Sequence, residues 1–378
     1  MLGVTTNGDP TNQSFHGGLP WSLLEALKQE GLSHRSIDCS RFDSRPQRIT
    51  GRLKYVLSQG GIRGFQYSRT YQKEICKWLV SESIRLQVDG VISFYPLLTT
   101  ANRFIKGDAP PTSLYIDATI DQIIYNYGRI EMNKRQIQDA IERQEECLRK
   151  SKKIYCRNNW VYDHAMKYYG ISESKLQLLP GSGNMHIVRA SNDSCLEEDF
   201  EGVDSGLRLL FLGKDTRRKN LAEVLDVARI ITETGKKCSV HVVGSEYQPE
   251  GFDNIEVVVH GYVDPSSEAK RLVRLIKSSH FTCLFSSAEG GPRSNIESYL
   301  CGTPVVTHDI GGISSTFIEG SGLMFSPESS SSEKAEAICK LFDDKRRYRE
   351  HRDLALRVSN KLFDWQETAR VLASIQSQ

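Results

Sequence analysis

Short apolar runs rich in β-branched and aromatic residues alternate along the chain with longer segments in which apolar residues recur at helical spacing. The short runs predict strands and the longer segments predict helices, so an α/β fold is expected. The run at 281–287 is the most informative, because a loop with two glycines and a proline at 288–293 and a short helical segment at 294–301 follow it. Further strands are predicted at 1–6, 36–39, 90–95, 113–116, 153–156, 176–179, 207–213, 239–243, 256–261, 304–307 and 322–325.

The length of the chain and a break in the pattern predict two domains. The chain has 378 residues, which is more than one hydrophobic core usually serves. The strand and helix pattern of the first half ends near residue 190 and begins again at 207. The stretch at 192–206 is acidic and polar without periodicity, which is typical of a connection. We therefore place the domain boundary between about 184 and 206.

Composition limits the partners and the compartment. Hydrophobic residues make up 39% and charged residues 25% of the chain, and the net charge of +2 gives no reason to expect a nucleic-acid partner. No run approaches eighteen apolar residues and no signal peptide is recognisable, so no membrane-spanning helix is predicted. The nine cysteines, an odd number without Cys-x-x-Cys spacing, favour a reducing compartment and a cytoplasmic location.

Two glutamates and two glycines in the stretch after residue 287 suggest a ligand. Gly290 and Gly291 precede a short helix that Ser294 or Asn295 could cap, and a helix N-terminus beyond a strand offers free N–H groups to an anion. Glu289 and Glu297, separated by seven residues, would repel a phosphate, so they are better suited to hold hydroxyl groups. A phosphate with several hydroxyls indicates a nucleotide sugar. The alternative is a capped helix with two solvated glutamates.

This stretch resembles the signature of retaining family 4 glycosyltransferases of the GT-B fold, also called glycosyl transferases group 1. That signature has two glutamates seven residues apart, a short helix, Gly-x-Pro-Val-Val and a Gly-Gly turn. After Glu289, Gly-Gly-Pro replaces the commoner Gly-Phe-Gly, and bacterial polysaccharide-type members have a similar Glu-Gly-x-Pro. The resemblance covers nearly the whole chain and is strongest over 207–320. The matching residues are Glu289, Glu297, Gly302, Pro304, Val305, Val306, Gly311 and Gly312.

The resemblance implies two Rossmann-like domains with parallel sheets facing across a cleft. It implies an acceptor-binding domain over 1–190, a domain that binds the nucleotide sugar over 207–355, and a C-terminal helix at 356–378 that packs back on the first domain. The implied activity is transfer of a sugar from a nucleoside diphosphate sugar to an acceptor hydroxyl, with retention, in polysaccharide or glycolipid synthesis. It is of hexosyltransferase type and needs neither a metal nor a cofactor, and the chain has no Asp-x-Asp or His-x-x-x-His sequence.

Basic residues after the strand at 207–213 resemble those with which the family grips the donor diphosphate. Lys219 matches the family's lysine, and either Arg218 or Lys214 stands in for its arginine, beyond Gly213. Arginine suits phosphate as a fork and lysine suits it as a point charge. A solvated basic turn is the alternative. The resemblance further implies that Glu289 holds the hydroxyls of the transferred sugar and that the second signature glutamate holds those of the ribose.

Two positions in the first half are weaker candidates. Gly17 and Gly18 precede a helix that contains Pro20 in its first turn, and the resemblance places such a pair near the donor diphosphate or the acceptor. Asp117, after the strand at 113–116, is the candidate for a sugar hydroxyl or for orienting the acceptor as a base. The alternatives are an ordinary turn for the glycines and a capping role for the aspartate.

The segment 41–73 carries eight Lys or Arg residues and one acid, interleaved with apolar residues. It could contact an anionic membrane surface or an anionic acceptor, and a solvated charged face is the alternative. If the acceptor is a lipid-linked saccharide, the enzyme is expected at the inner face of the membrane. Two other functions stay open: a catalytically silent protein that binds nucleotide sugars, and a nucleotide-sugar epimerase of the same fold.

Overall fold

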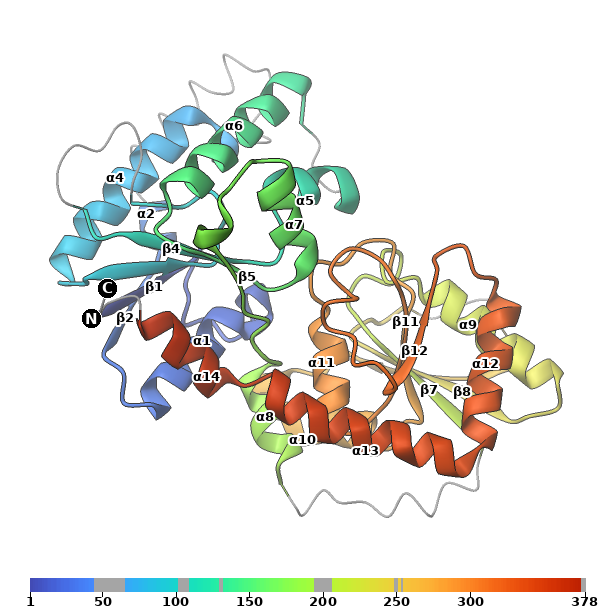
Figure 1. Ribbon diagram of the computed structural model, residues 1–378. Coiled ribbons are helices and arrows are strands. Elements are labelled where there is room, and N and C mark those ends of the chain that lie inside the picture. The colour runs from blue at the N-terminus through green and yellow to red at the C-terminus, as the bar shows by residue number, and fades with distance from the viewer. Residues whose placement is uncertain are drawn as a thin grey trace. The chain divides into compact units, whose positions relative to one another are not determined.

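The computed structural model describes residues 1–43, 65–100, 109–128, 132–193, 206–247, 251–252 and 254–374. The chain divides into two compact units, one of Met1–Gly181 with Trp365–Gln378 and one of Ser182–Asp364. Within the described residues, each unit contains a six-stranded parallel sheet with helices packed against it (Figure 1). The predicted α/β architecture of two Rossmann-like domains is therefore confirmed.

The sheet of the first unit has the strand order β2-β1-β3-β4-β5-β6. Chain order reverses between β1 and β3, so the loops that follow these two strands diverge at the carboxyl edge of the sheet. β3 and β4 are buried along their whole length, as expected of strands with helices on both faces. The strands are β1 Leu2–Thr5, β2 His34–Ile37, β3 Gly90–Ser93, β4 Thr112–Ile116, β5 Ile154–Cys156 and β6 Leu176–Leu178.

Polar side chains start several helices of this unit. Ser68 accepts a hydrogen bond from the Tyr71 N–H at 3.2 Å, and Asn158 accepts one from the Val161 N–H at 2.8 Å. Such caps satisfy N–H groups that have no partner inside the helix. The helices and 3-10 turns are η1 Phe15–Gly18, α1 Leu19–Gln29, α2 Ser40–Asp43, η2 Phe65–Tyr67, α4 Arg69–Arg85, α5 Ile120–Tyr127, α6 Lys134–Lys150, α7 Asn159–Lys167, η3 Glu173–Lys175 and α14 Trp365–Ala373.

The sheet of the second unit has the order β12-β11-β10-β7-β8-β9, which reverses between β7 and β10. Its core lies between this sheet and helices whose apolar residues recur at helical spacing, such as Leu221, Val224 and Ala228. The elements are α8 Met185–Ser191, β7 Leu207–Leu212, α9 Leu221–Glu233, β8 Cys238–Val243, β9 Glu256–Gly261, α10 Pro265–Lys277, β10 Phe281–Leu284, α11 Arg293–Leu300, β11 Val305–His308, β12 Gly322–Phe325, α12 Ser331–Asp343 and α13 Lys345–Leu362.

The unit boundaries differ from the predicted domain limits of 1–190, 207–355 and 356–378. Helix α8 belongs to the second unit, because Ile187 packs in one cluster with Leu210 of β7 and Leu272 of α10. Helix α13 also stays in the second unit up to residue 362. The sequence pattern could not show this, because an amphipathic helix does not reveal which sheet its apolar face covers.

The C-terminal helix α14 returns to the first unit, as expected. It packs on α1 (Figure 1), and Arg370 forms an ion pair with Glu30 at 2.7 Å. Trp365, the first residue of α14, is 1% exposed. Burial of this large aromatic side chain anchors the returning segment in the first unit.

Two sequence predictions fall largely outside the described residues. Residues 44–64 hold most of the basic segment that was expected to meet a membrane or an anionic acceptor, and 194–205 hold most of the predicted connection. In the part of the chain that the structure describes, no helix is long and apolar enough to cross a membrane.

Candidate active site

The loops that follow β7 and β10 meet at the point where the strand order of the second unit reverses. Because β7 and β10 are adjacent parallel strands, their carboxyl ends lie at the same edge of the sheet. The Ser287 N–H donates a hydrogen bond to the carbonyl of Arg218 at 2.9 Å, which joins the two loops. Ligands of open α/β sheets bind at such a reversal, so this edge is the candidate site.

Two of the predicted residues converge there on a third, the carboxylate of Glu289. Arg218 Nη1 donates to Glu289 Oε1 at 2.7 Å, and Lys219 Nζ lies 3.3 Å from the same oxygen. The hydroxyl of Ser286 also donates to Oε1, at 3.1 Å. Glu289 is 7% exposed. Asp215 Oδ2 also lies 3.5 Å from Arg218 Nε, so the group joins the buried Glu289 carboxylate and two cations with a second carboxylate.

The local field keeps Glu289 ionised. Burial alone would raise the pKa of Glu289, but the charges of Lys219 and Arg218 outweigh it and lower that pKa below its ordinary value. Burial lowers the pKa of Lys219, an effect that Glu289 opposes and Arg218 adds to. Arg218 is also paired with Asp215, and Arg293 adds positive charge near Lys219. Such a cluster of cations is suited to bind the diphosphate of a ligand.

Arg218 and Lys219 are positioned by backbone contacts. Arg218 Nη1 also donates to the carbonyl of Ala288 at 2.6 Å, and the Arg218 N–H donates to Asp215 Oδ1 at 3.1 Å. A Cβ atom on Gly213 would lie 2.1 Å from Lys219 Cδ, so only glycine lets the lysine side chain pass. The physical role of Gly213, at the end of the strand, is therefore to leave room for the Lys219 side chain.

The Gly-Gly turn of the signature packs against the backbone of Glu289. Gly311 has a φ of +59°, and a Cβ there would lie 2.1 Å from the Glu289 carbonyl oxygen. The Gly312 N–H donates to that oxygen at 2.9 Å. Any other residue at 311 would both strain the backbone and collide with the glutamate.

The start of α11 differs from the prediction. The residue before its first turn is Pro292, and neither Ser294 nor Asn295 caps the helix. Asn295 is fully buried, and its side-chain amide has no hydrogen-bond partner within the described ranges. Gly290 and Gly291 lie in the loop as predicted, and a Cβ on Gly291 would meet nothing within 4 Å in the described structure.

Glu297 is held separately from Glu289. Its Oε1 accepts a hydrogen bond from the Asn184 N–H at 3.0 Å. A Cβ on Gly183 would lie 2.8 Å from Glu297 Cγ, so the turn before α8 sits directly against this glutamate. The predicted pair of glutamates is thus divided between two sets of contacts.

Lys214 does not join the Glu289 group. Its Nζ lies 4.0 Å from the centre of the Tyr262 ring, in a cation–π contact. Glu246, in the loop after β8, accepts a hydrogen bond from the Tyr262 N–H at 3.3 Å. Of the two candidates for the family's arginine, Arg218 is therefore the one that contacts Glu289.

In the first unit, the glycine pair adopts a conformation that favours glycine. Gly17 and Gly18 have φ values of +62° and +84°, and His16 before them has +45°. Gly18 is buried and immediately precedes α1, whose first turn contains Pro20. Three successive left-handed residues turn the chain sharply between η1 and this helix.

Asp117 lies just beyond β4, and its side chain is 46% exposed. The buried Arg157 reaches it at 3.5 Å, and Asn158 Nδ2 donates to the Asp117 carbonyl at 2.8 Å. The cap of the next helix, α5, is Thr119. Asp117 is therefore not the residue that caps α5.

Sequence reasoning missed several residues that support the site. Ser286 and Asp215 hold Glu289 and Arg218, and Glu246 holds the turn that carries Tyr262. Asp215 stands in a loop that was singled out, and Ser286 falls in the run that was predicted as a strand, yet nothing in their spacing distinguished them from their neighbours. Their contacts depend on side-chain directions that only the folded loops define.

The chain is similar to known proteins in part of its sequence and in its fold. Residues 199–355 match the family model of glycosyl transferases group 1. No curated protein sequence matches the chain. Sucrose-phosphate synthase from Thermosynechococcus elongatus is 15% identical, with 100% of this chain and 98% of that one covered and a TM-score of 0.68.

Two further solved structures share the fold. HepE from Anabaena in complex with UDP-glucose is 13% identical, with 100% and 98% of the two chains covered and a TM-score of 0.61. WaaG, a glycosyltransferase involved in lipopolysaccharide biosynthesis, is 15% identical, with 82% and 84% covered and a TM-score of 0.58. The second unit therefore belongs to the glycosyl transferases group 1 family, and the protein is a glycosyltransferase of the GT-B fold.

Proposed function

We propose that the protein transfers a hexose from a UDP-sugar to an acceptor hydroxyl and retains the configuration at the anomeric carbon. One observation carries the proposal: Arg218 and Lys219 converge on the buried carboxylate of Glu289 where the strand order reverses. A nucleoside diphosphate sugar offers the complementary groups, namely an anionic diphosphate and sugar hydroxyls. The complex of HepE with UDP-glucose supports uridine as the base.

The two cations would stabilise the leaving group. As the bond from the anomeric carbon to the diphosphate breaks, negative charge grows on the phosphate oxygens, and Arg218 and Lys219 neutralise it. A preorganised cation at such a point is already oriented when the charge develops. Loss of one such donor typically raises the barrier by about 2.7–4 kcal/mol.

Glu289 would bind hydroxyls of the transferred sugar once the diphosphate takes over its cations. The acceptor oxygen forms the new bond to the anomeric carbon on the face from which the UDP leaves, and the acceptor proton passes to the departing diphosphate oxygen. Asp117, half-exposed at the end of β4, is proposed to bind a hydroxyl of the same sugar. Gly17 and Gly18 are proposed to lie near the donor or the acceptor.

The remaining predicted residues are assigned to the nucleotide. Glu297 is proposed to accept hydrogen bonds from the ribose hydroxyls. Its Oε1 accepts from the Asn184 N–H, and its Oε2 is the oxygen proposed to meet the ribose. Lys214, which contacts the ring of Tyr262, is proposed to lie near the nucleotide base. The loop glycines and Asn295 complete the proposed donor site at the start of α11.

The acceptor is proposed to be a saccharide or a lipid-linked saccharide, in polysaccharide or glycolipid synthesis. The involvement of WaaG in lipopolysaccharide biosynthesis supports this choice. We further propose a cytoplasmic location, with peripheral contact at the inner face of the membrane through 41–73 if the acceptor carries a lipid.

The test is release of the nucleoside diphosphate from a panel of nucleotide sugars, without acceptor. Wild type is compared with Glu289→Ala and with Glu319→Ala, which removes an exposed glutamate of the same unit. The proposal predicts slow release from one UDP-sugar, lost in Glu289→Ala and kept in Glu319→Ala. UDP binding without release from any donor, even with a saccharide acceptor mixture, would favour a silent binding protein.

A further inference from the structure

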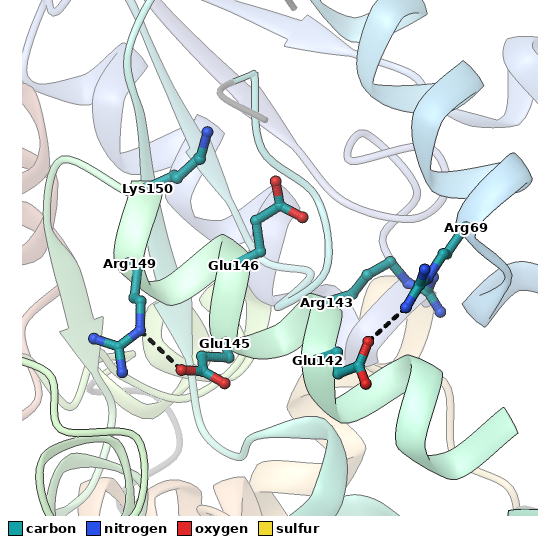
Figure 2. Close-up of a pocket in the computed structure, with 7 residues that line it drawn as sticks. All are labelled: Arg69, Glu142, Arg143, Glu145, Glu146, Arg149 and Lys150. Carbon is teal, nitrogen blue, oxygen red and sulfur yellow. Dashed lines mark hydrogen bonds and ion pairs between the residues drawn. The ribbon is translucent and has the colours of Figure 1, made fainter. Parts of the chain in front are cut away.

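A charged hollow lies in the first unit, on the outer side of α6. Figure 2 shows its lining, which comes from α6 and from Arg69 at the start of α4. Its volume is about 380 Å³. The lining contains four basic and three acidic side chains, so one positive charge is in excess: Arg69, Glu142, Arg143, Glu145, Glu146, Arg149 and Lys150.

Two of the arginines are paired at the rim. Arg69 Nη2 donates to Glu142 at 2.6 Å, and Arg149 Nε donates to Glu145 at 2.9 Å, as the dashed lines in Figure 2 show. Arg149 also donates to the carbonyl of Tyr169 at 2.8 Å. These pairs are largely exposed, so each contributes little to stability.

Arg143 is different, because it is a buried charge without a partner. It is only 6% exposed, yet none of its three guanidinium nitrogens has a hydrogen-bond partner among the residues that the structure describes. Asp139, one turn earlier on α6, attracts it electrostatically but is 3.5 Å from Arg69 and makes no ion pair with Arg143. Buried polar groups in proteins are nearly always hydrogen-bonded, so this gap needs an explanation.

Asp139 is a negatively charged neighbour of Arg143, but it is paired with Arg69, which repels Arg143. Burial lowers the pKa of Arg143 to about 10, which leaves the guanidinium charged at neutral pH. Burial raises the pKa values of Tyr95 and Cys147 well above their ordinary values, so both stay neutral beside it. A buried guanidinium without hydrogen bonds is unfavourable, and an anionic ligand would supply them.

We propose that this hollow binds a phosphate group, with the guanidinium of Arg143 as its buried recognition fork. Arginine offers several N–H donors in one plane, and a phosphate has enough oxygens to accept from Arg143 and from a rim cation at once. The hollow is larger than a phosphate alone, so the phosphate is carried by an organic group. The site belongs to the first unit and shares no residue with the Glu289 group of the second unit.

Binding is tested by isothermal titration of the full chain with inorganic phosphate. Because the Glu289 group could also take phosphate, the titrations use a Lys219→Met background, which removes that complication. We expect binding to weaken at least tenfold when Arg143→Met is added. The matched control is Arg85→Met, an arginine of α4 that is exposed and paired with Glu82 of the same helix, and it should leave binding unchanged.

A thermal unfolding measurement separates a ligand site from a structural role. If Arg143 is kept for a ligand, Arg143→Met in phosphate-free buffer should have the same Tm as the parent or a higher one, because an unpaired buried charge is removed. Phosphate should raise the Tm of the parent but not that of Arg143→Met. A lowered Tm together with unchanged phosphate affinity would overturn the proposal.

Two further ligands identify the source of the phosphate. Glycerol 1-phosphate represents a soluble phosphate ester, and vesicles of phosphatidylglycerol in phosphatidylcholine represent a membrane headgroup. Binding to either one that depends on Arg143 supports the proposal and names the source. If Arg143→Met binds inorganic phosphate, the soluble ester and the vesicles as the parent does, the proposal is wrong.

Discussion

Replacing Lys219 by methionine separates the work of this residue in catalysis from its work in folding. The ammonium of Lys219 lies 3.3 Å from Glu289 Oε1, whereas Arg218 at 2.7 Å and the hydroxyl of Ser286 at 3.1 Å would remain. The methionine keeps most of the apolar stem that passes Gly213. The carboxylate is therefore not left unpaired in the variant.

The two expected magnitudes differ clearly. Because Glu289 keeps its stronger partner, the free energy of unfolding should fall by less than about 2 kcal/mol. The variant lacks one of the two cations that are proposed to neutralise the leaving diphosphate, so the barrier should rise by about 2.7–4 kcal/mol. This corresponds to a fall in kcat/KM of about 100- to 1000-fold.

Two assays are needed on the same preparations. Turnover is followed as UDP release from the donor that wild type accepts, and stability is followed by urea unfolding. The control is Lys340→Met, which removes an exposed lysine on α12 of the same unit and should change neither quantity. If Lys219→Met turns over as fast as wild type, the assigned role is refuted. If the free energy of unfolding falls by as much as the barrier rises, the role of Lys219 is structural.

Three further predictions follow from contacts within the second unit. Gly213→Ala should lower turnover about tenfold or more with little loss of donor specificity, because the new Cβ would lie 2.1 Å from Lys219 Cδ and the lysine side chain would have to move. Unchanged turnover would contradict this. Lys334 is fully buried and its Nζ lies 2.6 Å from Glu223 Oε1, so Lys334→Met should lower the free energy of unfolding, measured in urea, by about 3 kcal/mol. Adding Glu223→Gln to this variant should restore part of the loss. The lowered pKa of Glu289 means that its ion pairs stabilise the protein above the ordinary glutamate pKa and that this stability is lost as pH falls through the lower folded value. The difference in stability between wild type and Glu289→Gln should therefore be constant above about pH 5 and shrink as pH falls from there through the folded pKa of Glu289; a difference that does not change with pH would disprove the linkage.

The convergence of Arg218 and Lys219 on Glu289 could be predicted because it depends on topology. The residues follow two parallel strands, and adjacent strands bring the loops at their carboxyl ends together. The short apolar runs that predict these strands are buried on both faces, which is the environment that such runs favour. The motif and the fold therefore led to the same place.

What could not be predicted depends on side-chain directions. Both Lys214 and Arg218 were candidates for the family's arginine. In the structure Arg218 binds Glu289, whereas Lys214 makes a cation–π contact with the ring of Tyr262. Likewise, Glu297 could have joined Glu289, but the turn before α8 supplies an N–H from Asn184. These preferences arise between segments far apart in the sequence, and no spacing rule reports them.

Local signals also failed at two points. The polar residues at 294 and 295 suggested a cap for α11, but the helix begins one residue earlier, after Pro292, whose fixed φ suits the position. The apolar run at 281–287 was predicted as one strand, but β10 ends at Leu284 and the rest of the run belongs to the loop. Arg143 shows a third limit, because an arginine in a highly charged helix is normally solvated and only the packing of the first unit buries it.

The central claim is that Arg218 and Lys219 bind the diphosphate of the donor, and comparing UDP with uridine by isothermal titration tests it most directly. The difference between the two ligands isolates the contribution of the phosphates. Wild type should bind UDP at least about 100-fold more tightly than uridine, and Lys219→Met should lose about 1.5–3 kcal/mol of that difference while its affinity for uridine stays unchanged. Equal affinities for UDP and uridine in wild type, or a full preference for UDP in Lys219→Met, would contradict the account.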